Sequence, residues 1–388
     1  MNFDNMIDQH NTADEKHDQM KEYFGRDDLL PMWVAEMDFQ TSPLIIDALT
    51  KRCEHGIFGY SYRTDEYLNS ITDWYAHNHH CSIERDMLSF DSGVIRSLFE
   101  LIRLFTKPHD QILIPVPAYA QFAKVIQLTG RKMLPYPLRA LHGRFYFDEE
   151  VLMEALSNTS MMVLCSPHNP GGQIWTKEEL TMIASCCERT NTVLVSDEIH
   201  SDLALNPDQF TTMLRISKQA IVLNSPSKAF NLAGLQHSYA ICQDKTMQEQ
   251  IKKHYEINKV KSYNTLSMLA LETAYVKGDA YLRDVRAYIK ENYQTVVAYI
   301  QDHQLNLPVF ELEAGYLMWI DFRSYFDTAD KLDDFLVNTC HIATTAGRNF
   351  HDERSGCFSR LNIATQKVNC IEAMNRIEAG LKAKGYIV

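Results

Sequence analysis

The stretch NSPSKAF, residues 224–230, directly follows the apolar run AIVL and contains one lysine. An apolar run of this length is typical of a buried strand, and a lysine beside one is unusual unless the site needs an amine. A partly buried amine can act as a nucleophile or a base. Lys228 is therefore the first candidate for chemistry, and the alternative is a surface lysine at the start of a helix.

Four further apolar runs also end in polar or turn residues. The five runs, in chain order, are DMLSF (86–90), QILIP (111–115), MMVLC (161–165), TVLVS (192–196) and AIVLN (220–224). They are followed by DSG, VPAY, SPHNPGG, DEIH and SPSK, respectively. In open α/β sheets, ligands bind beyond the carboxyl ends of the strands. We therefore expect the amide, carboxylate, amine and hydroxyl groups of these endings to form one site.

The segment DSG before a helical pattern suits a phosphate, because the free amides at a helix N-terminus attract anions. Ser225 and Ser227 could add hydroxyl donors. Neither G-x-G-x-x-G nor G-x-x-x-x-G-K-[ST] occurs in the chain, which argues against a nicotinamide cofactor and an NTPase site. The expected ligand is a phosphate compound of another kind.

The elements around these endings alternate between strand and helix patterns, which favours an α/β fold with a mostly parallel sheet and helices on both faces. TKEELTMIASCCERT carries a capping box at Thr176 and Glu179, and VIRSLFELIRLF (94–105) is a second amphipathic helix. After about residue 280, a long helical stretch leads into the strand YLMWIDF. We expect a large α/β domain at 46–280 and a smaller α+β domain built from 1–45 and 281–388.

The net charge of −12 over 388 residues disfavours nucleic acid and anionic membranes as partners. No apolar run reaches the length of a membrane span, and the N-terminus does not resemble a signal peptide. Nine scattered cysteines favour reduced thiols and a cytoplasmic protein. The stretch HNHHC (77–81) lacks a second group of ligands at zinc-like spacing, so we expect a solvated helix end and no metal.

Three of the motifs resemble a known family. SPHNPGG, VSDEIH and SPSKAFNLAGL resemble fold-type I pyridoxal-phosphate (PLP) enzymes of the aminotransferase class I/II superfamily. More narrowly, PMWVAEMDF (31–39), HGIFGY (55–60) and SPHNPGG…W…EL resemble the MalY/PatB-type cystathionine β-lyases, and the likeness runs from about residue 30 to about 365. This resemblance implies a PLP cofactor and a homodimer that builds its active sites at the subunit interface.

The resemblance also implies roles around the cofactor ring. Lys228 matches the Schiff-base lysine that later serves as the base at Cα, and Asp197 matches the partner of the pyridinium nitrogen. Asn169 should bond the phenolic oxygen, Tyr119 should stack on the ring, and His200 should lie near the cofactor oxygen. The structural alternatives are a helix N-cap for Asp197, a core tyrosine and a satisfied histidine.

For the phosphate, the resemblance implies Gly93, Val94 and Ser225, together with Tyr60 of the neighbouring subunit. Tyr60 could instead be a locally packed loop tyrosine. With Lys228 and Tyr119, Tyr60 completes the catalytic candidates. The chain has Gln236 where aminotransferases usually carry a phosphate-binding arginine, and either His237 or the amides and hydroxyls would compensate.

Arg360 matches the arginine that holds the substrate α-carboxylate, for which a guanidinium fork is suited. The alternative is a surface salt bridge. The segment after it, ATQKVN, departs from the usual CPRS-like spelling of the family. The wall facing the substrate side chain is expected from residues 32–40 and 340–350 and from the partner's loop near Tyr60.

The function implied is α,β-elimination of L-cystathionine or related cysteine S-conjugates to pyruvate, ammonia and a thiol. Either Tyr60 or Lys228 could protonate the sulfur. One rival is an aminotransferase, which would share every cofactor residue. The other is a regulatory protein that keeps the cofactor and binds a transcription factor.

Overall fold

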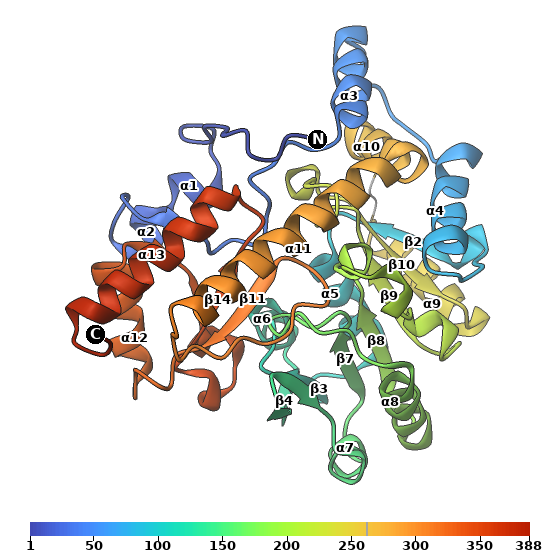
Figure 1. Ribbon diagram of the computed structural model, residues 1–388. Coiled ribbons are helices and arrows are strands. Elements are labelled where there is room, and N and C mark those ends of the chain that lie inside the picture. The colour runs from blue at the N-terminus through green and yellow to red at the C-terminus, as the bar shows by residue number, and fades with distance from the viewer. Residues whose placement is uncertain (261–262) are drawn as a thin grey trace.

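A seven-stranded sheet forms the centre of the protein in this computed structural model, which describes residues 1–260 and 263–388 (Figure 1). Its strands, in spatial order, are β2 (Leu88–Asp91), β10 (Ser238–Cys242), β9 (Ile221–Asn224), β8 (Val193–Asp197), β7 (Met161–Cys165), β3 (Gln111–Val116) and β4 (Lys132–Pro137). Strand β10 is antiparallel to both of its neighbours, and all the other pairs are parallel. The five strands predicted from sequence are confirmed, whereas β4 and β10 were not predicted.

Helices cover both faces of this sheet, as predicted. Alternation along β7 directs Met161 and Val163 to one face, which packs against α5 (Val94–Phe105), α6 (Ala120–Leu128) and α9 (Lys245–Ile257). It directs Met162 and Leu164 to the other face, which packs against α4 (Asp65–Asn78), α7 (Glu149–Leu156), α8 (Lys177–Thr190) and α10 (Thr265–Lys277). Burial on both faces explains why these strands read as continuous apolar runs.

The two helices predicted in detail are confirmed. Helix α8 begins after Thr176, whose Oγ1 accepts from the amide of Glu179 at 3.1 Å, while the Glu179 carboxylate accepts from the amide of Thr176 at 2.8 Å. Helix α5 spans the predicted residues 94–105. Its N-terminus meets the sheet at the end of β2, which matters for the site.

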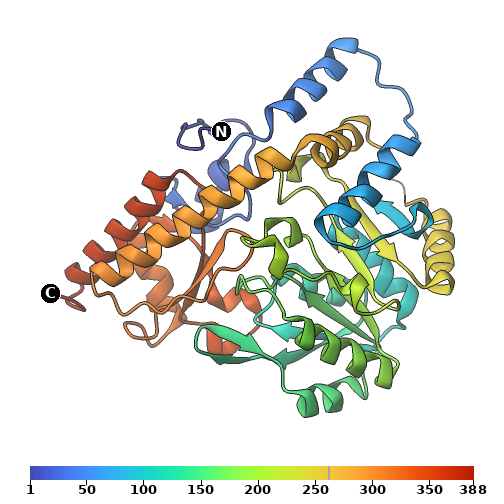
Figure 2. The ribbon, with the colours of Figure 1, turned by 45° about the vertical axis from the view of Figure 1, so that its right-hand side comes forward.

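The two ends of the chain meet beside the sheet. A second sheet has the order β11 (Leu317–Asp321), β14 (Phe358–Asn362), β13 (Thr345–Ala346), and β1 (Leu30–Pro31) pairs with β12 (Ile342–Ala343). Figure 2 shows the long helix α11 (Asp279–Asp302) running beside the C-terminal helix α13 (Lys367–Ala383), near the blue N-terminal segment. The remaining α-helices and strands are α1 (Glu15–Asp18), α2 (Met20–Phe24), α3 (Pro43–His55), α12 (Ala329–Asp334) and the hairpin of β5 (Arg139–Leu141) and β6 (Arg144–Tyr146). The domain boundaries at residues 46 and 280 stay a prediction.

The stretch HNHHC differs from expectation. His77 and His80 are exposed, whereas His79 is buried with Nε2 at 3.0 Å from an Asp202 carboxylate oxygen, and Cys81 is buried as well. The pairing fixes the end of α4 against the core. Within residues 1–260 and 263–388, no group of histidine, cysteine and acidic residues could hold a metal ion. No helix in these same ranges is long and apolar enough to cross a membrane.

Candidate active site

A cavity of about 530 Å³ opens at the carboxyl ends of the parallel strands. Eight of the residues singled out from the sequence line it: Gly93, Val94, Tyr119, Asn169, Asp197, His200, Ser225 and Lys228. They lie at or just after the ends of β2, β3, β7, β8 and β9, so these strand ends bring together residues that lie far apart in the chain. This is the position at which open α/β sheets bind ligands.

Lys228 lies in this cavity with its Nζ at 2.7 Å from the carbonyl oxygen of Ala35, which accepts a hydrogen bond from it. Burial, reinforced by the charge of Arg360, lowers the pKa of Lys228 to about 8, against the opposing fields of Glu36 and Asp197. A lysine with a lowered pKa is partly neutral near pH 7 and can attack a carbonyl carbon. The amine has the properties that the sequence indicated.

Asp197 ends β8 and is only 4% exposed. Burial raises the pKa of its carboxyl to about 7, although the amide of Ile199 donates to Oδ1 at 3.1 Å and the charge of Lys228 lowers the pKa. Within residues 1–260 and 263–388 this carboxyl forms no ion pair, and a protonated ring nitrogen would supply a cationic partner. Its bond to Ile199 also shows that Asp197 organises the turn after β8.

Arg360 lies on β14, is 5% exposed and bonds to Asn169, which lines the cavity. Nη1 donates to Asn169 Oδ1 at 3.0 Å, and Nη2 donates to the carbonyl of Trp33 and to Thr345 Oγ1, both at 3.1 Å. Its Nε is buried without a hydrogen-bond partner in the described part of the chain. A buried guanidinium that contacts only neutral acceptors is costly, and a carboxylate ligand would relieve that cost. This contradicts the surface-salt-bridge alternative.

The N-terminus of α5 forms one end of the cavity. The first intrahelical bond runs from the Ser97 amide to the Gly93 carbonyl at 2.9 Å, so the amides of residues 94–96 have no acceptor within the helix. A β-carbon added to Gly93 would meet no protein atom within 4 Å. The space beside Gly93 and the unpaired amides fit an anionic group such as a phosphate.

Ser225 and His237 also border this end. The Ser225 hydroxyl donates to the His237 carbonyl at 2.6 Å and accepts from the Ser227 amide at 3.1 Å, so its proton is engaged within the protein. His237 Nε2 lies 2.5 Å from the Tyr67 hydroxyl, and burial lowers the pKa of the imidazole to about 4. A neutral imidazole cannot replace the charge of the arginine that Gln236 replaces, so His237 does not compensate for that arginine.

Tyr119 and His200 both line the cavity. Tyr119 precedes α6 and its ring meets Phe122 edge-on at 5.7 Å, which leaves a face for stacking. Burial lowers the pKa of His200 to about 3, so the imidazole is neutral, and its Nδ1 is buried without a partner among the described residues.

Tyr60 does not reach this cavity within the chain. It lies between α3 and α4 and is fully exposed, and its neighbours Ile57, Phe58 and Tyr62 are 66%, 58% and 74% exposed. An exposed row of large apolar side chains marks an interaction surface.

The sequence reasoning missed the backbone acceptors of the segment PMWVAEMDF. The carbonyls of Trp33 and Ala35 accept from Arg360 and Lys228, and the Tyr316 hydroxyl also donates to Ala35 at 2.9 Å. The segment was expected only as pocket wall. The available signal was its spelling, which carried the family resemblance, but a spelling does not show which carbonyls face inward.

The chain matches the family model described as aminotransferase class I and II over residues 28–377. It is 32% identical to cystathionine β-lyase PatB of Bacillus subtilis, covering 98% of this chain and all of the relative, and 31% identical to protein MalY of Escherichia coli, covering 93% of each. Among solved structures, a PLP-bound protein of Clostridium difficile 630 described as an aminotransferase has a TM-score of 0.95 at 34% identity, covering 98% and 99% of the two chains. Cystalysin of Treponema denticola, which contains PLP, has a TM-score of 0.94 at 27% identity with the same coverage.

Proposed function

Because the chain belongs to the aminotransferase class I and II family, we propose that it is a PLP-dependent carbon–sulfur lyase. Its substrates would be L-cystathionine or related cysteine S-conjugates, cleaved to pyruvate, ammonia and a thiol. The observation that carries the proposal is one cavity that holds the Lys228 amine and the Asp197 carboxyl, with the Arg360 guanidinium bonded to Asn169 on its wall. The similarity to PatB, which is named a cystathionine β-lyase, supports this reaction over others.

The residues divide the work as follows. Lys228 would hold the cofactor covalently and, once the substrate replaces it, remove the proton from Cα. Arg360 would bind the α-carboxylate, and Asp197 would hold a proton on the ring nitrogen. When bound, the cofactor supplies the electron sink that makes the Cα proton removable. A thiolate then leaves from Cβ, and Lys228 or Tyr60 would protonate it.

The phosphate would lie at the N-terminus of α5, beside Gly93 and Val94, with Ser225 nearby. Asn169 would contact the phenolic oxygen, Tyr119 would stack on the ring, and His200 would lie close to the ring oxygen. All of these residues line the same cavity, which supports the assignment. The chain has Gln236 where aminotransferases usually carry a phosphate-binding arginine, and the free amides at this helix end suit a phosphate.

A homodimer would complete the site. The exposed segment Ile57–Tyr62 would pack on a second copy and bring Tyr60 to the phosphate or the substrate there. A buried position in a dimer accounts for four large apolar side chains that are more than half exposed in one chain.

We place the protein in the cytoplasm because its nine cysteines are free thiols in the structure. Eight of these cysteines are buried. Unpaired thiols are typical of proteins in a reducing compartment.

An aminotransferase is the second candidate, since the C. difficile relative is described as one. The two reactions separate when L-cystathionine is supplied with and without 2-oxoglutarate. The lyase gives pyruvate and a thiol in both cases. Amino transfer that depends on 2-oxoglutarate, with no pyruvate in its absence, would overturn the proposal.

A further inference from the structure

The segment 31–39, spelled PMWVAEMDF and called here the 31–39 loop, links the two charged groups of the site. Its Trp33 carbonyl accepts from Arg360 Nη2 at 3.1 Å, and its Ala35 carbonyl accepts from Lys228 Nζ at 2.7 Å. The two acceptors are two residues apart, so a displacement of the loop changes both contacts together. The loop position therefore bears on the carboxylate site and on the amine at once.

One end of the loop is held by an asparagine from the lysine segment. Asn231, three residues after Lys228, donates through Nδ2 to the carbonyls of Met37 at 2.8 Å and Phe39 at 2.9 Å. Its Oδ1 accepts from the Met37 amide at 3.1 Å. Both donors of this amide are used on the loop.

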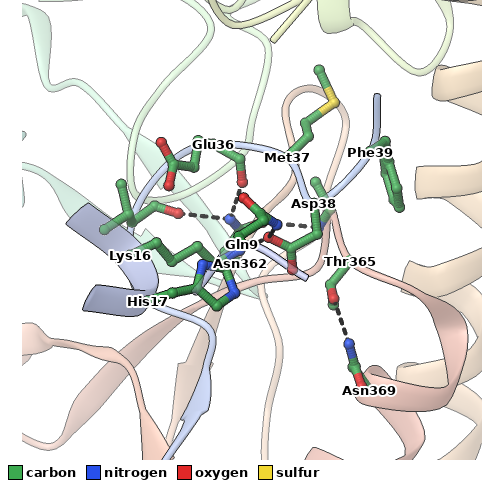
Figure 3. A network of polar contacts seen from close by, with 12 residues as sticks. Gln9, Lys16, His17, Glu36, Met37, Asp38, Phe39, Asn362, Thr365 and Asn369 are labelled. Carbon is green, nitrogen blue, oxygen red and sulfur yellow. Dashed lines mark hydrogen bonds and ion pairs between the residues drawn. The ribbon is translucent and has the colours of Figure 1, made fainter. Parts of the chain in front are cut away.

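The middle of the loop is held by an asparagine from the arginine strand, as Figure 3 shows. Asn362, two residues after Arg360, is wholly buried and donates to the carbonyls of Val34 and Glu36, each at 2.6 Å. These carbonyls flank Ala35. The buried ion pair between Lys16 and Asp38, at 2.6 Å, fixes the loop further and leaves it little freedom of its own.

We propose that Asn231 and Asn362 are positioning residues that couple the carboxylate site at Arg360 to the amine of Lys228 through the 31–39 loop. The inference rests on the roles given to Arg360 and Lys228 in the proposed function. A carbonyl acceptor favours the ammonium form of lysine, so the place of the Ala35 carbonyl sets how readily Lys228 holds a proton. The Trp33 carbonyl in turn orients the guanidinium fork.

The test uses the full-length cofactor-free chain and measures each substitution at the more distant charged group in the sequence. Asn362, which follows Arg360, is tested at Lys228, and Asn231, which follows Lys228, is tested at Arg360. For Asn362→Ala, the rate at which PLP attaches to Lys228 is followed against pH. Loss of a well-placed acceptor should shift the midpoint downward by up to about one pH unit. For Asn231→Ala, binding of propionate, which has a carboxylate and no amine, is followed by NMR and should weaken about tenfold.

Asn292→Ala is the matched control. Asn292 is wholly buried and donates to the carbonyls of Ile363 at 2.9 Å and Thr365 at 2.8 Å, without touching the loop. It should change neither the pH midpoint nor the affinity for propionate. The proposal would be overturned if Asn362→Ala changed only propionate binding and Asn231→Ala only the pH midpoint, or if Asn292→Ala gave the same effects.

If Asn362→Ala does not fold, Asn231→Ala decides alone. Asn231 is only half-buried, and its predicted effect is on propionate binding at Arg360. Neither readout requires turnover. A wild-type protein that releases no pyruvate but shows the crossed effects would refute the lyase and leave the coupling standing.

Discussion

Lys228 and Asp197 share one cavity, and burial moves the pKa of each group toward neutrality, to about 8 and about 7. Among the residues that the structure describes, neither group forms an ion pair with a partner of opposite charge. Shifted pKa values of this kind are typical of catalytic sites, where reactive groups lower the stability of the fold. The carboxyl therefore costs stability in the cofactor-free chain.

That cost predicts a pH-dependent effect of Asp197→Asn on the cofactor-free protein. Because the pKa of Asp197 is raised from 3.8 to about 7, the folded state binds a proton that the unfolded state releases, and stability falls as pH rises between these values. The neutral variant should match the wild type at about pH 4 and be more stable by up to about 4 kcal/mol at about pH 8. Urea unfolding at both pH values measures this, and an equal difference at both would contradict the burial argument.

Arg360→Lys should damage substrate binding more than cofactor binding. A lysine keeps the charge but loses the fork that grips a carboxylate. We expect kcat/KM for the amino-acid substrate to fall about 100-fold, mainly through KM, with the affinity for PLP within about twofold of wild type. Steady-state kinetics and PLP titration check this. A fall in PLP affinity as large as the fall in kcat/KM would place Arg360 at the cofactor instead.

At the scale of the elements, the predictable part of the fold is the part with strong local signals. Five buried strands, the capping box of α8 and the amphipathic face of α5 follow from the residues themselves. Strand β4 was missed because its spelling, KMLPYP, contains two prolines at an exposed edge, and β10 because it reverses direction between parallel neighbours. The carbonyls of the 31–39 loop were missed because their partners come from distant segments.

The N-terminus of α5 carries a prediction of its own. Gly93 has extended backbone, and a β-carbon there meets no protein atom, so Gly93→Ala should change the stability of the cofactor-free protein by less than about 0.5 kcal/mol. The methyl group would occupy space beside the free amides, so PLP affinity should fall at least about tenfold. Binding of pyridoxal, which lacks the phosphate, should change much less. Equal losses for the two ligands would show that the phosphate does not bind at this helix end.

For the whole molecule, the chain ends build a second layer beside the sheet, and the segment with Tyr60 extends away from it (Figure 1). The sequence resemblance led us to expect Tyr60 in the site, and within one chain it does not line the cavity. No pattern in a single sequence reports contacts between copies, so its role depends on the proposed dimer.

Mixed dimers test that role. Tyr60→Ala and Lys228→Ala should each be nearly inactive alone. If each site takes Lys228 from one subunit and Tyr60 from the other, a mixed dimer regains one intact site, and a random mixture should recover about a quarter of wild-type activity. Activity is measured after the two variants are unfolded and refolded together. No recovery, with mixed dimers demonstrated by mass, would place Tyr60 outside the site.

The most direct test of the central claim is the release of pyruvate from L-cystathionine by the PLP-loaded protein, with no keto acid added. The account predicts pyruvate, ammonia and thiol in equal amounts over many turnovers, and a fall of at least about 1000-fold in Lys228→Ala. Lys245→Ala, on the exposed side of α9, is the control and should retain full activity. Pyruvate release that persists in Lys228→Ala, or its absence from the wild-type protein, would contradict the account.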